Sequence, residues 1–361
     1  MTVKRLRPIA WMLLAVLTFP GEVYAAMLTG LYEVRVPVVD RTAAARRVAV
    51  QQGLAVVLVK VTGERNLGGP LVGLLSHADQ YVQQYRYEQA PPDTAQPNAA
   101  SAGSQSQNLV LWAKFDADVV NQAAHGAGAP VWGTERPRTL VWLAVQEGNT
   151  PHIINAGDSS FLVPALVAAA DQRGLSLVLP QMDGPDRSAI GLPDVTGFMQ
   201  DRLLQASARY KPDAVLVGTV TPFGTGQYAA RWQLLYGGAP QAWETPPAAE
   251  SDAATDGVEG AADRYAQRLA IPASAGDLDG VSLAVDGVTS LDAYGKLLHY
   301  LEALTPVRAV HVERVEQGSV YFGVDVHGTL DVLEQTMVLG GLLTPATNTP
   351  APTPLRYRYA P

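Results

Sequence analysis

Three successive stretches of the chain differ in the spacing of their apolar residues, and each stretch predicts one folded unit. In the amino-terminal unit, residues 27–135, apolar and polar side chains alternate over 31–39, as in a strand with one buried face. An apolar stripe at helical spacing follows and ends at Gly63, a residue type that commonly terminates helices. Further strands at 81–89 and 109–117 predict an α+β fold for this unit.

The middle unit, residues 136–272, shows a different pattern. Short continuous apolar runs at 139–145 and 175–180 are typical of strands buried inside a parallel sheet, and residues 160–174 between them have helical spacing. Alternating strands and helices of these lengths predict a small, largely parallel α/β sheet. Residues 245–257 are rich in Pro, Ala and acidic residues and have no apolar period, so we expect a surface loop or linker there.

The carboxy-terminal unit, residues 278–361, has the clearest order of elements. The pattern predicts a strand at 281–288, a helix from Ser290, strands at 307–315 and 319–327, a helix from Thr329 and a strand at 355–359. This β-α-β-β-α-β order is typical of ferredoxin-like, or split βαβ, folds. We expect the proline-rich segment 344–354 to be a loop before the last strand. The whole chain therefore combines α/β and α+β architecture in three small units.

Residues 1–25 predict a cleaved signal peptide. Three basic residues precede an apolar run, and Val23 and Ala25 occupy the small-residue positions that signal peptidase recognises. The apolar run is shorter than the roughly 20 residues that a membrane-spanning helix needs. The chain has 0 cysteines, which excludes both disulfides and a lipid-modified cysteine. We therefore expect an exported periplasmic protein with no lipid anchor and no transmembrane segment in the mature chain.

Charge and composition narrow the range of partners. The chain carries 34 acidic and 26 basic residues, a net charge of -8, and has no basic run, so we do not expect nucleic acid as a partner. Residues 90–107 are rich in Pro, Ala, Ser and Gln and predict a low-complexity insert in the amino-terminal unit.

Four phrases, spread over the chain in a fixed order, carry a resemblance to a known family. They are FDADVVNQAAHGAGAPVWGTERPRTLVWLAV, RGLSLVLPQMD, RYKPDAVLVGTV and YGKLLHYLEAL. With them the chain resembles the bacterial exported family catalogued as domain of unknown function 2066. The middle unit is also similar, in its order of elements, to the amino-terminal domain of the Tol-Pal translocation protein. The resemblance implies an envelope protein of unassigned activity, and it implies no catalytic residues.

Residues around the start of the middle unit suggest a domain boundary. Gly133 permits a sharp change of chain direction, and Pro137 forces the preceding residue into an extended conformation. We expect Trp132 and Trp142 to bury large side-chain areas where the two units meet. The alternative is a platform for a glycan or a peptide, in which the two aromatic faces act together with Arg136 or Arg138 as hydrogen-bond donors. We favour the boundary, because the other tryptophans also lie in apparent core strands.

The candidates for ligand binding are three carboxylates, Asp183, Asp186 and Asp194. They follow the second predicted strand of the middle unit, at the end where parallel α/β sheets often bind ligands. The alternative is ordinary turn chemistry, since Asp-Gly-Pro-Asp is a common turn sequence.

The histidines do not predict a metal site. Pairing 307–315 with 319–327 through a three-residue loop places His311 opposite Gly323 and His327 opposite Val307. The two imidazoles then lie about 13 Å apart along the strands, too far for one ion. We therefore expect no metal and no cofactor.

No motif combines a nucleophile, a base and an oxyanion donor, so the sequence does not favour an enzyme. We expect a non-enzymatic periplasmic protein that acts by protein binding, as an adaptor or assembly factor with a partner in the cell envelope. The alternative is a periplasmic protein that binds a small ligand or a glycan. The residues identify neither the partner nor the oligomeric state.

Overall fold

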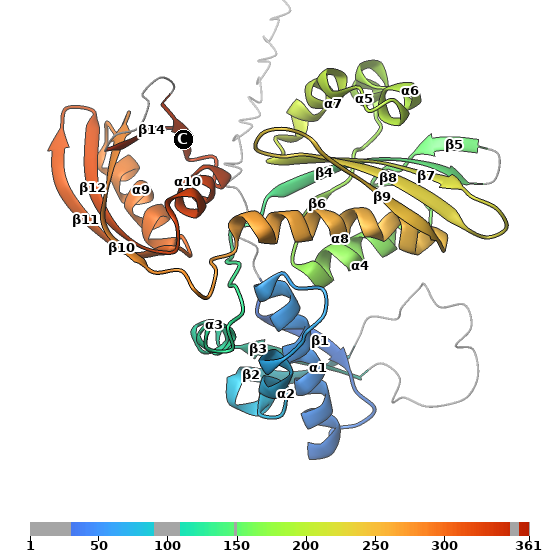
Figure 1. Cartoon of the computed structure of the whole chain (residues 1–361), viewed down its shortest axis with the longest axis horizontal. Helices are drawn as coiled ribbons and strands as arrows, with labels where there is room; N and C mark the ends of the chain where they lie inside the picture. Colours follow the sequence, from blue (N-terminus) through green and yellow to red (C-terminus); the bar gives the residue numbers. More distant parts are fainter. Residues whose placement is uncertain (1–29, 90–108, 148–149, 347–353, 361) are drawn as a thin grey trace, which may run out of the picture.

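The computed structural model describes residues 30–89, 109–147, 150–346 and 354–360, which form three sheets with their own helices (Figure 1). The predicted signal peptide and the insert 90–107 lie outside the described residues. The architecture is mixed α/β in three units, as the sequence predicts. Among the described helices, none has both the length and the apolar character needed to cross a membrane.

The amino-terminal unit is an antiparallel sheet in the order β1-β3-β2 with one long helix packed on it. Its elements are β1 (Glu33–Pro37), α1 (Ala43–Thr62), α2 (Pro70–Leu75), η1 (Ala78–Tyr81), β2 (Val82–Gln89), β3 (Leu109–Phe115) and α3 (Ala117–Gly126). The side chain of Thr42 caps the start of α1, and Gly63 ends it in the left-handed conformation. Leu54, Val57 and Leu111 belong to the core between the helix and the sheet.

The middle unit has a six-stranded mixed sheet with helices on both faces. Its strands are β4 (Arg138–Glu147), β5 (Thr150–Ile153), β6 (Ser176–Val178), β7 (Ala214–Pro222), β8 (Tyr228–Leu235) and β9 (Gln241–Ala248). Its helices are α4 (Leu162–Arg173), α5 (Gly184–Ala189), α6 (Leu192–Thr196), α7 (Gln200–Ser207), η3 (Ala208–Tyr210) and α8 (Glu250–Leu269). Only β6, β4 and β7 are parallel, and every other pairing is antiparallel. Helices α4 and α8 cover one face, and α5 to α7 cover the other (Figure 1).

The prediction of a linker at 245–257 is wrong. Strand β9 continues to Ala248, and α8 begins at Glu250 and runs through the rest of the segment. The buried stripe of this part of α8 is made of small residues, among them Ala253 and Gly257, and small residues give only a weak apolar signal. Gly257 is needed there because a Cβ would lie 2.4 Å from the Trp232 ring.

The carboxy-terminal unit has a five-stranded sheet in the order β11-β12-β10-β14-β13. Its elements are β10 (Asp277–Asp286), α9 (Leu291–Ala303), β11 (Val307–Glu316), β12 (Ser319–His327), α10 (Leu330–Leu339), β13 (Leu343–Pro345) and β14 (Leu355–Tyr359). The predicted final strand is confirmed: β14 pairs with β10, and Tyr357 and Tyr359 are buried. It runs parallel to β10, and β13 adds a further strand outside it, at the start of the segment expected to be a loop.

The predicted register of β11 and β12 is confirmed in the middle of the pair and wrong at both ends. His311 lies opposite Gly323, but Val307 lies opposite Val326 instead of His327. Strand β11 has irregularities after Val307 and after Val312, and the extra residues bulge out of the strand. Glu316, which the prediction placed in a three-residue loop, pairs with Ser319, so the turn has two residues and the bulge after Val312 restores the predicted register at His311.

Candidate functional site

The segment from Val131 to Arg136 contacts all three units. Val131 exchanges two backbone hydrogen bonds with Ile271, which connects the middle and carboxy-terminal units, at 2.9 and 2.8 Å. The N–H of Trp132 donates to the carbonyl of Val61 in the amino-terminal unit at 2.6 Å. In the carboxy-terminal unit, the N–H of Thr305 donates to the Glu135 carboxylate at 2.8 Å. We call residues 131–136 the linker, and all three units are connected through its hydrogen bonds.

Close packing at the linker leaves little room for an aromatic platform. A Cβ on Gly133 would lie 2.0 Å from Oγ1 of Thr305, so only glycine fits against this neighbour. The rings of Trp132 and Trp142 are fully buried, Trp132 in the core with α4 and α8 and Trp142 in the core on the opposite face of the middle sheet, and Pro137 is buried as well. Neither ring presents a face to a ligand from solvent.

Arg136 is buried without a carboxylate among its hydrogen-bond partners. Its guanidinium donates to the carbonyls of Gly133, Lys60 and Trp132 at 2.7 to 2.8 Å and stacks on the Trp132 ring at 3.5 Å. Burial lowers the pKa of Arg136 to about 9, and the nearby Tyr32 and Glu135 oppose that shift. Among the described residues, Nη1 has no hydrogen-bond partner. The side chain thus ties the turn of the linker to the end of α1.

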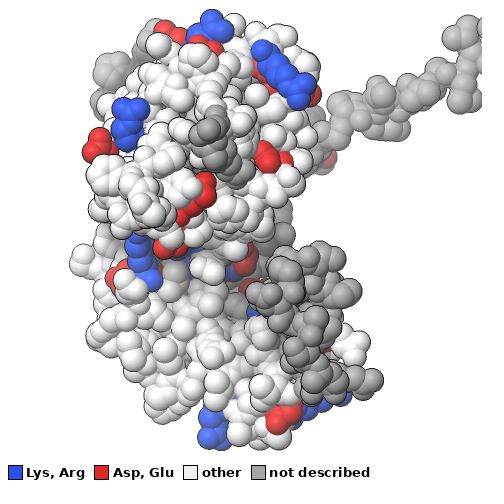
Figure 2. Space-filling view, turned by 90° about the vertical axis from the view of Figure 1, so that its right-hand side faces the viewer, with Lys and Arg blue, Asp and Glu red and all other residues white. Residues whose placement is uncertain are grey.

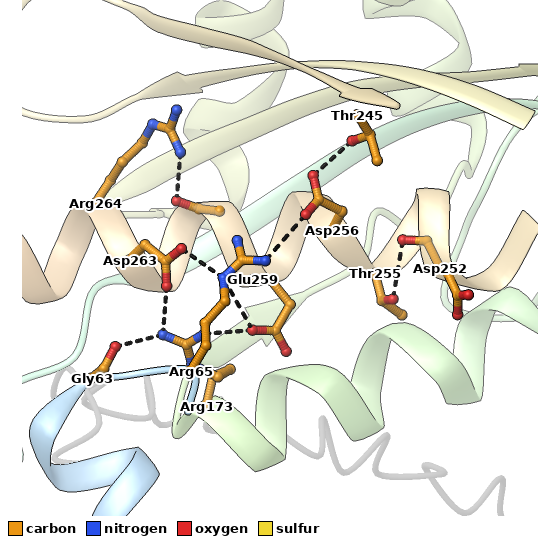
Figure 3. Close-up of polar contacts among 11 residues, drawn as sticks. Gly63, Arg65, Arg173, Thr245, Asp252, Thr255, Asp256, Glu259, Asp263 and Arg264 are labelled. Carbon is orange, nitrogen blue, oxygen red and sulfur yellow. Dashed lines mark hydrogen bonds and ion pairs between the residues drawn. The ribbon is translucent and has the colours of Figure 1, made fainter. Parts of the chain in front are cut away.

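A network of arginines and carboxylates joins the amino-terminal unit to α8 (Figure 3). Arg173, 2% exposed, comes from the last turn of α4. It contacts Glu259 at 2.5 Å, Asp263 at 2.7 Å and the Gly63 carbonyl at 2.7 Å. Arg65, which follows α1 in the amino-terminal unit, contacts the same Asp263 at 2.7 Å. One carboxylate of α8 therefore serves two arginines from different units.

Arg65 also reaches Asp256, at 3.3 Å, and Asp256 accepts a hydrogen bond from Thr245 of β9 at 2.7 Å. Burial acts to lower the pKa of Arg65, but the hydrogen bonds and charges of Asp263 and Asp256 raise it above its ordinary value. The acidic positions repeat along one side of α8. Sequence reasoning missed this site, although the spacing of Asp256, Glu259 and Asp263 was a visible signal.

A cavity of about 530 Å³ lies beside the network. It is lined on one side by the segment from Thr62 to Asn66 and on the other by α8 residues such as Gln267. Figure 2 shows that the molecule is hollowed between its upper and lower parts, with acidic and basic side chains in the hollow. The cavity is open and partly polar, and its size is in the range of small-ligand sites.

The three carboxylates proposed for ligand binding are engaged within the protein. Asp183 caps α5 and forms a two-point ion pair with Arg209 at 2.6 and 2.8 Å, which lowers its pKa to about 2. Asp186 is fully buried and accepts hydrogen bonds from Tyr210, at 2.5 Å, and from Arg209, at 2.8 Å. Asp194 accepts from the N–H of Gly191 at 2.8 Å.

The loop brings Asp183 and Asp186 together, while Asp194 caps the next helix. All three hold short helices in place, as turn chemistry predicts. In the described part of the chain, no group of three or more His, Asp or Glu side chains could hold a metal ion.

Comparison with known proteins corrects the predicted family. Residues 25–133 match the family described as Domain of unknown function (DUF8605), instead of domain of unknown function 2066, and no similarity to the Tol-Pal translocation protein is shown. The four phrases misled because three of them begin after residue 133 and consist largely of short apolar strand and helix segments, which recur in many folds. No curated protein matches the chain. Residues 25–133, which end within the linker, are therefore similar to Domain of unknown function (DUF8605), and the other two units lie outside that match.

Proposed function

We propose that the protein acts by protein binding, without catalysis, as an adaptor or assembly factor of the cell envelope. The observation that carries this proposal is the exposure of large apolar side chains on the middle unit. Five of them are at least half exposed: Phe161, Val167, Met199, Leu204 and Phe223. Among the described residues, the other two units have two such side chains each, Val39 and Val48 in the amino-terminal unit and Leu291 and Val315 in the carboxy-terminal unit.

A low density of charge supports the same conclusion. Charged residues make up 17% of the chain, below the roughly 25% that is usual, and much of the face in Figure 2 is uncharged. Centres of protein interfaces are depleted in charge in the same way. The carboxylates of the Asp183 loop and of α8 meanwhile hold structural elements together, which leaves them unsuited to acid–base chemistry.

The periplasmic location rests on the pattern of residues 1–25 and belongs to the proposal. Cell fractionation with mass spectrometry of the amino terminus tests it. A mature chain that begins near Ala26 in the periplasmic fraction supports the location, whereas intact Met1 in the cytoplasm refutes it.

Site-specific photocrosslinking in cells tests the binding function. A photoreactive amino acid replaces Phe161, Met199 or Phe223, and replacement of Val48, which is similarly exposed on α1, serves as the control. We expect a discrete adduct with one envelope protein from at least one middle-unit position and none from Val48. Equal adducts from all positions, or none from any, would refute binding through the middle unit.

The cavity beside Arg65 favours a second candidate, a binding protein for a small ligand or a glycan. This alternative now rests on the cavity instead of the Asp183 loop. Equilibrium dialysis against a mixture of periplasmic metabolites and cell-wall fragments, with the variant Gln267→Trp to fill the cavity, tests it. A compound retained by the native protein and lost from the variant supports the alternative, and equal retention by both refutes it.

A further inference from the structure

Two histidines from different units lie against each other. His125 is in the last turn of α3 in the amino-terminal unit, and His327 ends β12 in the carboxy-terminal unit. Their ring centroids are 5.3 Å apart and the ring planes meet at 66°. This edge-to-face contact joins two units that the sequence separates by about 200 residues.

The surroundings of the pair contain one carboxylate with two cationic partners. Nδ1 of His327 is 2.7 Å from Oδ1 of Asp277, and Nη1 of Arg308 is 2.5 Å from Oδ2 of the same residue. Asp279 lies further out, 3.7 Å from Arg308. The hydrogen bond from His327, followed by the charge of Arg308, lowers the pKa of Asp277, so this carboxylate stays ionised in mild acid.

An ionised Asp277 determines which protonation step disturbs the contact. It accepts from Nδ1 of His327, so a positive charge on that ring is balanced by a neighbouring negative charge. A neutral His125 then packs against a cationic ring, which remains favourable. A second proton on His125 places two positive charges about one ring apart, and no contact found for His125 in the described residues supplies it with a carboxylate.

The other joints of the molecule do not share this property. The amino-terminal and middle units are held by the ion pairs of Arg65 with Asp256 and Asp263, and by the hydrogen bond that Arg173 donates to the Gly63 carbonyl. The middle and carboxy-terminal units are joined by Arg268, which donates to Gln335 at 2.7 Å. Neither joint contains a histidine, so mild acid leaves their charges in place.

We propose that His125 and His327 form a pH-sensitive contact between the amino-terminal and carboxy-terminal units. The contact is closed with no proton or one proton on the pair, and two protons weaken it. Acidification from pH 8 to 5 then loosens these two units from each other while the joint around Arg173 stays intact.

Distance measurements by fluorescence energy transfer test this inference. Because the chain has 0 cysteines, Val119→Cys on α3 and Leu291→Cys on α9 give two unique labelling positions, and both native side chains are exposed. We expect the fraction of molecules with a longer donor–acceptor separation to rise several-fold between pH 8 and 5. Tryptophan emission and circular dichroism, unchanged over the same range, ensure that the units stay folded.

His125→Phe keeps an aromatic ring in the contact but cannot be protonated, so we expect its distances to be independent of pH. His125→Gln gives a second uncharged variant if the phenylalanine variant folds poorly. His77→Phe changes an exposed histidine of the same unit away from the pair and should behave as the native protein does. Native distances that do not change with pH, or an equal change in the uncharged variants, would overturn the inference.

Discussion

Replacing Arg173 by methionine tests whether the joint between the amino-terminal unit and α8 stabilises the protein. The native side chain is 2% exposed and makes hydrogen bonds to Glu259, Asp263 and the Gly63 carbonyl. Methionine keeps much of the packing volume but removes the charge and all of these bonds. Two carboxylates and one carbonyl then lose the partner around which they are arranged.

The decrease in the free energy of unfolding depends on how well water can solvate Glu259 and Asp263 once Arg173 is gone. Removing one member of a fully buried ion pair costs about 3 to 5 kcal/mol. Here the Glu259 and Asp263 side chains are 24% and 30% exposed, and Arg65 still pairs with Asp263 at 2.7 Å. Water and Arg65 therefore recover part of the cost, and we expect the free energy of unfolding to fall by about 2 to 4 kcal/mol.

Urea unfolding measured by tryptophan fluorescence gives this free energy, and calorimetry shows whether the amino-terminal and middle units still melt together. The control is Arg65→Gln, because Arg65 is 41% exposed and its pairs should contribute only about 0.2 to 1 kcal/mol. We expect the Arg173→Met protein to melt in two separated transitions. An Arg173→Met loss no larger than that of Arg65→Gln would refute the expectation that the buried Arg173, which bonds both α8 and the Gly63 carbonyl, stabilises this joint more than the exposed Arg65 does.

Three further predictions concern packing, acid stability and the last strand. Gly257→Ala places a Cβ 2.4 Å from Trp232 and should lower the free energy of unfolding by about 1 to 3 kcal/mol. Gly295→Ala in α9 has open space around it and should raise that free energy by about 0.5 to 1 kcal/mol. Urea unfolding measures both changes. Because Arg209 lowers the pKa of Asp183 to about 2, the ion pair stabilises the fold fully above pH 4 and is lost as the pH falls toward 2. The difference in urea midpoint between the native protein and Asp183→Asn should therefore shrink between pH 5 and 2.5, and a constant difference would contradict this. Truncation after Pro354 removes β14 with its two buried tyrosines and exposes the edge of β10. Calorimetry should then show a lower melting temperature of the carboxy-terminal unit, or light scattering should show association through the exposed edge. A truncated protein that stays monomeric with an unchanged melting temperature would contradict the pairing of β14 with β10.

Local patterns predicted elements well wherever the buried side chains are large. The alternation of tyrosine and arginine in 355–359 identified β14, and the apolar run at 139–145 identified β4. An alternating pattern does not show, however, in which direction a strand runs or which strands lie beside it. The parallel orientation of β14 and the addition of β9 to the edge of the middle sheet follow from connections that only the folded chain defines.

The candidate site was harder to predict, because its residues come from distant segments and their pattern is polar. Arg65, Arg173 and Asp263 belong to three different elements, and no spacing in sequence brings them together. The carboxylates that sequence reasoning did select, such as Asp183, lie in a local turn whose purpose is to cap a helix. Carboxylates that are close together in the sequence were therefore easy to select, and they cap helices. The charged residues that join two units could be identified only from the folded structure.

The end of the family match at residue 133 gains a physical meaning from these contacts. The matched segment contains the core of the amino-terminal unit, but Gly63, on the surface of that unit, contacts residues further along the chain. A Cβ on Gly63 would lie 2.3 Å from the Cβ of Ala266 in α8, and the Gly63 carbonyl accepts from Arg173. Since both partners lie outside the matched segment, that segment can account for the amino-terminal core but not for its surface at the joint. The surface facing α8 packs against the middle unit of this chain, so any function that depends on this joint requires both units.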